Sequence, residues 1–390
     1  MPSLLAMLIT AGLAAAATWT ALLLLPWTSG PLTRRTRAFR GEREESPVVR
    51  LGGVCVVAGA LAGTVAGLNA SHWSGSLGGA SQYHWIGWIG GCAALFACGL
   101  YDDLYGLGAR VKLACQGSGA VVVFLAGFRV ESIALPGLGR FDLGLAALPL
   151  TVLWIVAVTN AINLIDGLDG LASGLCLMAS ATIAAVALAQ GVFPVALVGL
   201  ALSGALLGFL PFNLHPARFH LGDCGSQVIG FTLGVLALRG FQKSSTAVTL
   251  LAPVLILGVP LCDTALVILR RLWRGRNGSG AVPGSILRAR GWRAVFERDR
   301  EHVHYNLLDL GLSERRAVGV LYVTAAALCA SALVLVFRSS SVPALVTAIA
   351  VLVEIVVLKV WAGFRRGAVP PRSAASGEPI EGAATGPVPR

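Results

Sequence analysis

The chain has 390 residues, of which 56% are hydrophobic and only 13% are charged, and it carries a formal net charge of +11. An average soluble domain is about a quarter charged. The composition therefore argues against a soluble enzyme, a disordered protein and a secreted disulfide scaffold, and it favours a polytopic membrane protein.

Apolar runs of membrane-spanning length recur along the chain. Each is close to the roughly 20 residues that an α-helix needs to cross the hydrocarbon core of a bilayer. The first run has no basic residue before it and ten more runs after it, which favours a first span over a cleaved signal peptide. The eleven predicted spans cover residues 4–25, 51–69, 85–101, 111–127, 144–164, 171–189, 193–213, 224–241, 247–269, 317–337 and 343–363.

The basic residues lie mainly in alternate loops between these spans. One set of loops contains 24 of the 30 lysines and arginines, the other set contains five, and Lys359 lies inside the last span. Loops that face the cytoplasm are enriched in Lys and Arg. We therefore expect the N-terminus outside and the C-terminus in the cytoplasm, and no nucleic-acid partner is needed to explain the positive charge.

The predicted fold class is an all-α, polytopic membrane protein with one transmembrane domain over residues 1–363. Its largest cytoplasmic loop covers residues 270–316. Segment 364–390 is rich in Pro, Gly, Ala and Ser, which predicts a disordered cytoplasmic tail. The eight cysteines lie in or beside apolar runs without CxxC spacing, which is typical of packing residues and not of a disulfide framework or a zinc site.

Six of the nine aspartates stand inside or at the ends of apolar runs: Asp102, Asp103, Asp166, Asp169, Asp223 and Asp263. The predicted topology places the first five at cytoplasmic ends of spans. Asp263 precedes Arg270 by seven residues, which places it about two helical turns into the membrane from the same side. Such groups are costly in a membrane and usually face a water-filled cavity. Helix capping is the structural alternative, but five acids on one face favour a site.

Five carboxylates on one side would repel one another without a cation. A hard divalent cation such as Mg²⁺ prefers oxygen ligands and also bridges phosphates. The pattern therefore indicates phosphoryl transfer at the inner membrane surface with Mg²⁺, or with Mn²⁺ in its place. An ion-coupled transporter or lipid flippase is the non-enzymatic alternative, but it predicts acids near mid-membrane and an inverted repeat, and the sequence shows neither.

Four polar residues near the end of the fifth span are spaced by three: Asn160, Asn163, Asp166 and Asp169. On a helix each such step turns about 300°, so their side chains would spiral slowly across one side. This spacing suits groups that point into one cavity, with a polar seam between helices as the alternative. Lys112 is one of only three lysines in an arginine-rich chain, which favours a compact ammonium that holds a phosphate; a positive-inside charge is the alternative.

Four motifs follow one another on the predicted cytoplasmic face. They are Gly99-Leu100-Tyr101-Asp102-Asp103 with Lys112 and Gln116, the segment Asn160 to Gly170, the segment Asn213 to Ser226, and the segment Asp299 to Ser313. Together they resemble the bacterial polyprenyl-phosphate N-acetylhexosamine-1-phosphate transferases, a superfamily that includes phospho-N-acetylmuramoyl-pentapeptide translocase. The resemblance extends from about Pro47 to about Ser313.

The resemblance implies roles for individual residues. Asp102 and Asp103 would serve the polyprenyl phosphate and the catalytic step, with Asp102 as our candidate base and Asp103 in a supporting or metal role, or the reverse. Asp223 would be catalytic and a metal ligand, with Asp166 as a second ligand. The implied substrate-binding residues are Lys112, Asn160, Asn163, Asp166, Asp169, Asn213, His302 and His304.

The sequence departs from the family pattern at two positions. Tyr305 stands where many members have another histidine, and His220 stands where an apolar or aromatic residue is usual. Asp263 follows Pro260 as in the family, and a site role and a structural pairing role are both open for it.

The resemblance also implies a reaction. A UDP-N-acetylhexosamine, with UDP-GlcNAc as first choice, would donate its sugar 1-phosphate to undecaprenyl or decaprenyl phosphate and release UMP at the bacterial plasma membrane. UDP-MurNAc-pentapeptide is the alternative donor. We prefer a direct in-line attack over a covalent phospho-aspartate route, and a homodimer is left open.

Overall fold

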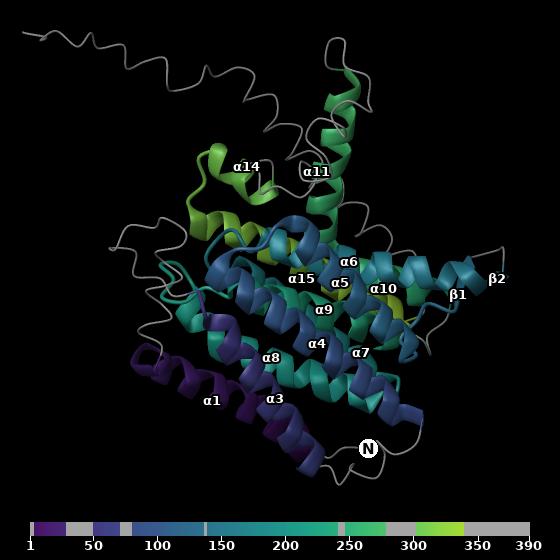
Figure 1. Cartoon of the computed structure of the whole chain (residues 1–390), viewed down its shortest axis with the longest axis horizontal. Helices are drawn as coiled ribbons and strands as arrows, with labels where there is room; N and C mark the ends of the chain where they lie inside the picture. The colour runs from purple at the N-terminus through teal and green to yellow at the C-terminus, as the bar shows by residue number, and fades with distance from the viewer. Residues whose placement is uncertain are drawn as a thin grey trace, which may run out of the picture.

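The computed structural model describes residues 4–28, 50–70, 80–135, 139–240, 246–277 and 302–338. This part of the chain is an α-helical bundle with one small hairpin (Figure 1). The first helices are α1 (Leu4–Thr28), α3 (Gly52–Ala70), α4 (Ala80–Tyr105) and α5 (Ala109–Leu125). They are followed by α6 (Ala147–Ile165), α7 (Leu171–Ala189), α8 (Phe193–Asn213) and α9 (Gly222–Gly240). The last are α10 (Thr246–Ile256), α11 (Gly258–Asn277), α14 (Val303–Asp309) and α15 (Glu314–Arg338).

Seven of the described helices are long and apolar enough to cross a membrane: α1, α3, α4, α6, α7, α8 and α15. Large apolar side chains stay exposed on the outside of the bundle, including Leu5, Leu125 and Leu153. An apolar outer surface of this kind suits contact with lipid. The chain is therefore an all-α, multi-pass membrane protein.

The predicted count of eleven spans and the orientation remain predictions. The predicted spans 111–127 and 224–241 are helices here, but α5 has 17 residues and α9 is not among the seven. The segment predicted as one span over 247–269 is two helices, because the chain turns at Leu257 between Pro253 and Pro260. The predicted span 343–363 and the tail 364–390 lie outside the described residues.

One element was not predicted. Strands β1 (Ser132–Leu135) and β2 (Gly139–Asp142) pair antiparallel, with Ser132 opposite Asp142, in the connection between α5 and α6. A short 3₁₀ turn, η2 (Gly144–Ala146), leads from β2 into α6. The hairpin extends from one side of the bundle (Figure 1).

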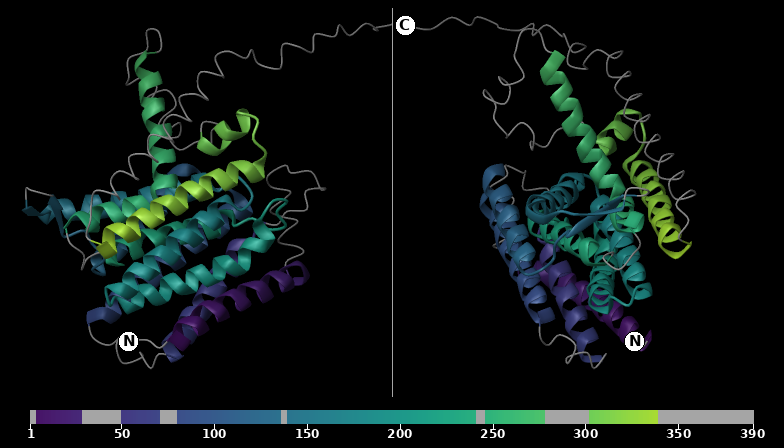
Figure 2. Two further views of the ribbon diagram at one scale, coloured as in Figure 1. Left: turned by 180° about the vertical axis from the view of Figure 1, so that it is seen from behind. Right: turned by 90° about the vertical axis from the view of Figure 1, so that its right-hand side faces the viewer.

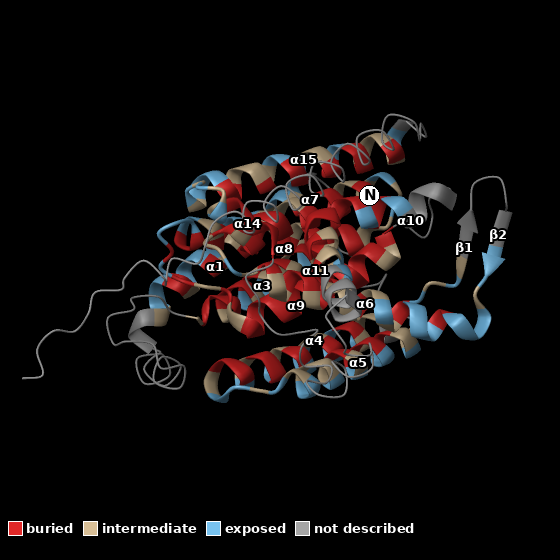
Figure 3. Ribbon diagram, turned by 90° about the horizontal axis from the view of Figure 1, so that it is seen from above, coloured by how far each residue is buried: buried red, intermediate tan, exposed pale blue. Residues whose placement is uncertain are grey.

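Helix α9 forms the centre of the bundle. It packs against α4 and α6 and also contacts α3, α7 and α8. Nearly all of its residues from Asp223 to Ala237 are buried, and the burial colouring concentrates on α7, α8 and α9 (Figure 3). The sequence explains this position, because α9 has small residues where neighbours approach: a Cβ on Gly230 would lie 2.9 Å from the Cα of Thr159 on α6.

Six helix ends meet at one end of the bundle. They are the first residues of α3, α7 and α9 and the last residues of α4, α6 and α8. Backbone contacts fix the meeting point, since the Gly52 and Gly53 N–H groups donate to the carbonyls of His220 and Leu221 at 3.0 and 2.9 Å. Helix α14 lies over this end, whereas α11 projects out of the bundle across the direction of its long helices (Figures 1 and 2).

Candidate active site

A cavity of about 250 Å³ opens where these helix ends meet. Its polar lining comes from segments far apart in the sequence and comprises Arg50, Asp103, Asp166, Asp169, His220, Asp223, His302 and Tyr305. Four of the five aspartates predicted at cytoplasmic ends therefore share one cavity. His220 was noted in the sequence as a departure from the family pattern, and neither His220 nor Arg50 was predicted as a site residue.

The fifth of these aspartates, Asp102, does not line the cavity, but Lys112 bridges it to the cavity residue Asp223. Its ammonium Nζ lies 2.6 Å from Asp102 Oδ2 and 3.2 Å from Asp223 Oδ2. The Leu107 N–H donates to the other Asp102 oxygen, so the loop after α4 orients this carboxylate. Both aspartates are buried, and Lys112 is the cation that the structure places between them. One ammonium group thus faces two carboxylates.

Asp103 is held in a different way from its neighbour. Its two carboxylate oxygens accept hydrogen bonds from the Asp223 and Cys224 N–H groups at 3.0 and 2.9 Å. These donors belong to the first turn of α9, whose N–H groups have no partner inside the helix. Asp103 therefore fastens the end of α4 to the start of α9. The adjacent aspartates therefore have different surroundings, because consecutive side chains on a helix point about 100° apart.

The four polar residues spaced by three, Asn160 to Asp169, do not all face the same cavity. The Asn163 amide donates to Asp223 Oδ1 at 2.6 Å and to Ser226 at 2.8 Å, and so orients the Asp223 carboxylate. The Asn160 amide donates to Gln116 Oε1 at 2.6 Å. Asn160, Asn163, Lys112 and Gln116 line a second, smaller recess of about 70 Å³ between α5 and α6. Asp166 and Asp169 instead line the main cavity.

Asn213 is buried behind the cavity and does not line it. Its Oδ1 accepts the Ser173 hydroxyl at 2.6 Å, and its amide donates to the Phe219 carbonyl at 2.8 Å. The side chain therefore fixes the loop between α8 and α9. Sequence spacing could not distinguish this position from one that faces a ligand.

Asp169 joins the same loop to the cavity rim. It accepts hydrogen bonds from the Ala217 N–H at 3.0 Å and contacts His215 and His220 at 3.0 and 3.1 Å. Burial alone would raise the pKa of Asp169, but these three hydrogen bonds outweigh it and the pKa lies below its ordinary value. His215 was not singled out from the sequence. A histidine directly before Pro216 in a loop gives no periodic signal.

The two histidines of the predicted His-x-His motif are both buried at the start of α14. His302 Nδ1 lies 2.7 Å from Asp263 Oδ2, and the Val303 N–H donates to Asp263 Oδ1 at 2.8 Å. Since an ionised carboxylate only accepts hydrogen bonds, Nδ1 carries the hydrogen and Nε2 is the ring atom left for a ligand. Asp263, for which two roles were open, has the structural pairing role and orients His302. The rings of His302 and His304 stack with centroids 5.6 Å apart.

Asp263→Asn should uncouple His302 from α11. The buried amide can accept one of the two hydrogen bonds but cannot replace the charged partner, so about 1–3 kcal/mol of local stability is lost. We expect KM for the nucleotide-sugar donor that the sequence resemblance implies to rise more than kcat falls. Steady-state kinetics on the purified variant measure this. Asp309→Asn, at an exposed position of α14, is the matched control, and equal kinetics for the two variants would contradict the prediction.

Lys112→Arg should impair the site although it keeps the charge. A planar guanidinium is larger than an ammonium and cannot occupy the same point between Asp102 and Asp223. We expect kcat to fall at least about tenfold, which corresponds to about 1.4 kcal/mol of activation free energy. The reciprocal change Arg110→Lys, two residues away and exposed, should leave kcat unchanged. Wild-type turnover in Lys112→Arg would show that only the charge matters.

The sequence is similar to proteins of a known family. Over residues 85–241 the sequence matches the family model described as glycosyl transferase family 4. A probable undecaprenyl-phosphate N-acetylglucosaminyl 1-phosphate transferase from Bacillus subtilis is 40% identical over 238 residues, or 61% of this chain and 62% of that protein. A decaprenyl-phosphate N-acetylglucosaminephosphotransferase from Mycobacterium leprae is 31% identical over 319 residues, or 75% of each chain. The chain belongs to glycosyl transferase family 4.

The family 4 match extends from α4 to α9 and so contains three of the four motifs. It includes all three asparagines predicted as site residues and the five aspartates predicted at cytoplasmic ends of spans. A phospho-N-acetylmuramoyl-pentapeptide-transferase from Bacillus pumilus is 36% identical over 218 residues, or 55% of this chain and 60% of that protein. A decaprenyl-phosphate N-acetylglucosaminephosphotransferase from Mycolicibacterium smegmatis is 33% identical over 285 residues. The chain covers 62% of the Bacillus subtilis relative and 66% of the Mycolicibacterium smegmatis relative, in each case less than two thirds of that protein's length.

Proposed function

We propose that this family 4 protein is a phosphotransferase of the bacterial plasma membrane. It transfers N-acetylglucosamine-1-phosphate from UDP-GlcNAc to undecaprenyl or decaprenyl phosphate and releases UMP, as the first membrane step of an envelope polysaccharide. The observation that carries the proposal is the Asp102–Lys112–Asp223 cluster beside a cavity lined by Asp166 and His302. Two relatives named for this kind of activity support the choice of donor and acceptor.

The carboxylates of the cavity fit a hard divalent cation. Asp166 and Asp223 both line the cavity, and oxygen atoms are the ligands that Mg²⁺ prefers. We propose that these two residues hold Mg²⁺, which would neutralise phosphate charge when bound. Asn163 orients Asp223 from the opposite side, so the position of this carboxylate is set before any ligand arrives.

We propose that the donor diphosphate binds in the main cavity. Arg50 provides N–H groups that can donate hydrogen bonds to phosphate oxygens there, and His302 lines the same cavity. The acceptor phosphate would approach from the side of Lys112, whose recess between α5 and α6 adjoins the main cavity at Leu164. The two substrates would then meet at Asp223, which belongs to both groups of contacts.

We propose a direct reaction in which Asp102 is the base, with Asp103 as the alternative. Asp102 accepts the proton of the lipid phosphate, whose oxygen attacks the sugar-bearing phosphorus of the donor. The bond from this phosphorus to the bridging oxygen breaks, and UMP leaves. One phosphoanhydride replaces another, so rate enhancement comes from positioning and charge neutralisation. Trapping a kinetically competent sugar phosphate adduct on an aspartate would overturn the direct route in favour of the covalent one.

Release of UMP tests the proposal. The purified protein in detergent receives undecaprenyl phosphate, Mg²⁺ and one donor at a time: UDP-GlcNAc, UDP-GalNAc or UDP-MurNAc-pentapeptide. We expect UMP from UDP-GlcNAc only, and none with a chelator. Turnover with UDP-MurNAc-pentapeptide alone would assign the second candidate function, which the Bacillus pumilus relative keeps open. No UMP from any donor with folded protein would overturn the proposed reaction.

A further inference from the structure

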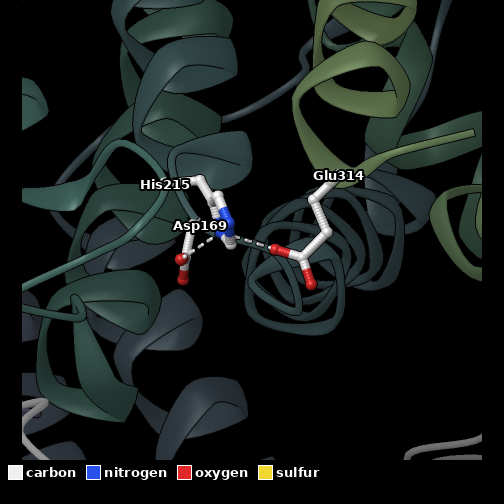
Figure 4. Close-up of side chains that lie close together, drawn as sticks. All are labelled: Asp169, His215 and Glu314. Carbon is white, nitrogen blue, oxygen red and sulfur yellow. Dashed lines mark hydrogen bonds and ion pairs between the residues drawn. The ribbon is translucent and has the colours of Figure 1, made fainter.

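Three side chains from three separate segments of the chain converge, and one of them, Asp169, also lines the main cavity (Figure 4). Asp169 comes from the α6–α7 loop, His215 from the α8–α9 loop, and Glu314 is the first residue of α15. His215 Nδ1 lies 3.0 Å from Asp169 Oδ2 and 2.8 Å from Glu314 Oε2. All three donor atoms lie within 4.8 Å of one another.

Hydrogen bonding alone does not satisfy this arrangement. An imidazole Nδ1 carries at most one hydrogen, yet two carboxylate oxygens face it at hydrogen-bond distance. The second oxygen therefore faces a nitrogen that has no hydrogen left to give, and the two carboxylates repel each other. A cation held between the three atoms would remove both problems. Ligand atoms that bind one metal at about 2.0–2.2 Å lie about 3 Å apart. His215 Nδ1 lies at 3.0 and 2.8 Å from the two carboxylate oxygens, and all three atoms lie within 4.8 Å of one another.

We propose that Asp169, His215 and Glu314 form a binding site for a divalent transition metal such as Zn²⁺, separate from the Asp166 and Asp223 carboxylates. A mixed set of one imidazole and two carboxylates suits Zn²⁺ or Mn²⁺ better than Mg²⁺ or Ca²⁺, which prefer oxygen ligands. The inference concerns a second site and does not rest on the proposed reaction.

The surroundings hold the ligands in place. His220 Nε2 lies at hydrogen-bond distance, 3.1 Å, from Asp169 Oδ1, and the Ala217 N–H donates to Asp169 Oδ2 at 3.0 Å. The Arg315 guanidinium donates to the His215 carbonyl at 3.1 Å. Such outer contacts orient metal ligands and are a regular part of metal sites. The His215 and Glu314 side chains are each 40% exposed, so an ion can enter and water can complete its coordination.

A bound ion would fasten the loops around the cavity. Glu314 begins α15, which follows the α14 segment that bears His302, whereas Asp169 lines the cavity itself. The metal would therefore tie the α14–α15 segment to the α6–α7 loop. A ligand that binds only the folded state raises its stability, so Zn²⁺ should raise the melting temperature.

The experiment uses full-length protein purified in detergent without a polyhistidine tag and stripped with a chelator. Co²⁺ is titrated with Mg²⁺ in excess while absorbance is recorded, and melting is measured with and without Zn²⁺. We expect one Co²⁺ per chain and a higher melting temperature with Zn²⁺. His215→Asn and Glu314→Gln should each weaken binding at least tenfold. Glu131→Gln, an exposed carboxylate paired with Arg129, is the matched control and should bind as the wild type does.

Two comparisons make the result decisive. Asp223→Asn should keep the Co²⁺ site, whereas loss of binding in this variant with retention in Glu314→Gln would place the ion in the main cavity and overturn the proposal. A sulfur-to-cobalt charge-transfer band would place it on cysteine and overturn it as well. Absence of Co²⁺ binding to the wild-type protein would overturn the proposal, and His215 would then only hydrogen-bond to its two carboxylate neighbours. UMP release, measured in parallel, reports on the proposed reaction independently.

Discussion

Asp223→Asn should abolish most UMP release while leaving the bundle folded. The amide keeps the size of the side chain but removes the negative charge that faces Lys112. In the wild type, Asn163 donates to one carboxylate oxygen and Lys112 to the other, and in the variant an NH₂ group replaces one of these two acceptors. One of these two donors then loses its acceptor in a buried setting. Loss of a single preorganised charged group in a site of this kind costs about 10²–10³-fold in kcat. We therefore expect a kcat reduced by that factor at saturating donor.

The control for this variant is Asp142→Asn. Asp142 is an exposed aspartate at the end of the β1–β2 hairpin, far from the helix ends that form the cavity. It should retain wild-type turnover. Far-UV circular dichroism and melting should be close to wild type for both proteins. Substantial UMP release from folded Asp223→Asn would remove this residue from the catalytic machinery.

Gly222→Ala should disrupt the site through the backbone. Gly222 has a φ of +69°, and a Cβ there would overlap the Arg50 carbonyl oxygen and lie 2.7 Å from Asp103 Oδ2. The left-handed conformation alone costs a non-glycine residue about 1–2 kcal/mol. The overlap adds to this cost, because the Arg50 backbone and the buried Asp103 carboxylate cannot easily move. We expect a clear drop in melting temperature together with the loss of most turnover.

Gly144→Ala separates the two costs. Gly144 also has a positive φ, +50°, but a Cβ there would meet nothing within 4 Å. It should therefore show the conformational cost without the overlap, and it should retain activity. Equal melting temperatures and activities for the two variants would contradict the argument that the contact with Asp103 matters at position 222.

The gathering of the aspartates could be predicted from the sequence. The positive-inside count assigns the ends of spans to one side, and this assignment alone brings Asp102, Asp103 and Asp223 to the same end of the bundle. The helical segments of the site also follow directly from apolar run length. Their packing does not, since the order of helices around α9 depends on which small faces fit together.

The direction of individual side chains could not be predicted in this way. Asn213 turns inward to fix a loop, and Asp103 accepts backbone N–H groups 120 residues later in the chain. Both contacts depend on where distant helix ends come together, which no local spacing encodes. The same holds for His215, which meets Glu314 across 99 positions of sequence. Whether Asn213 and Asp103 also contact substrates remains a prediction.

The central place of α9 has a consequence for how the protein is made. Helices α3 to α8 leave the ribosome before α9, yet α9 lies between α3, α4, α6, α7 and α8. Ser226, Gln227 and Thr232 face these neighbours and not lipid, so α9 gains its stable position in the membrane from partners that are already inserted. The packing of these earlier helices around α9 is therefore completed only after α9 has been made. A nascent chain stalled before residue 222 would carry Asp103 without the N–H groups of Asp223 and Cys224 that donate to its carboxylate.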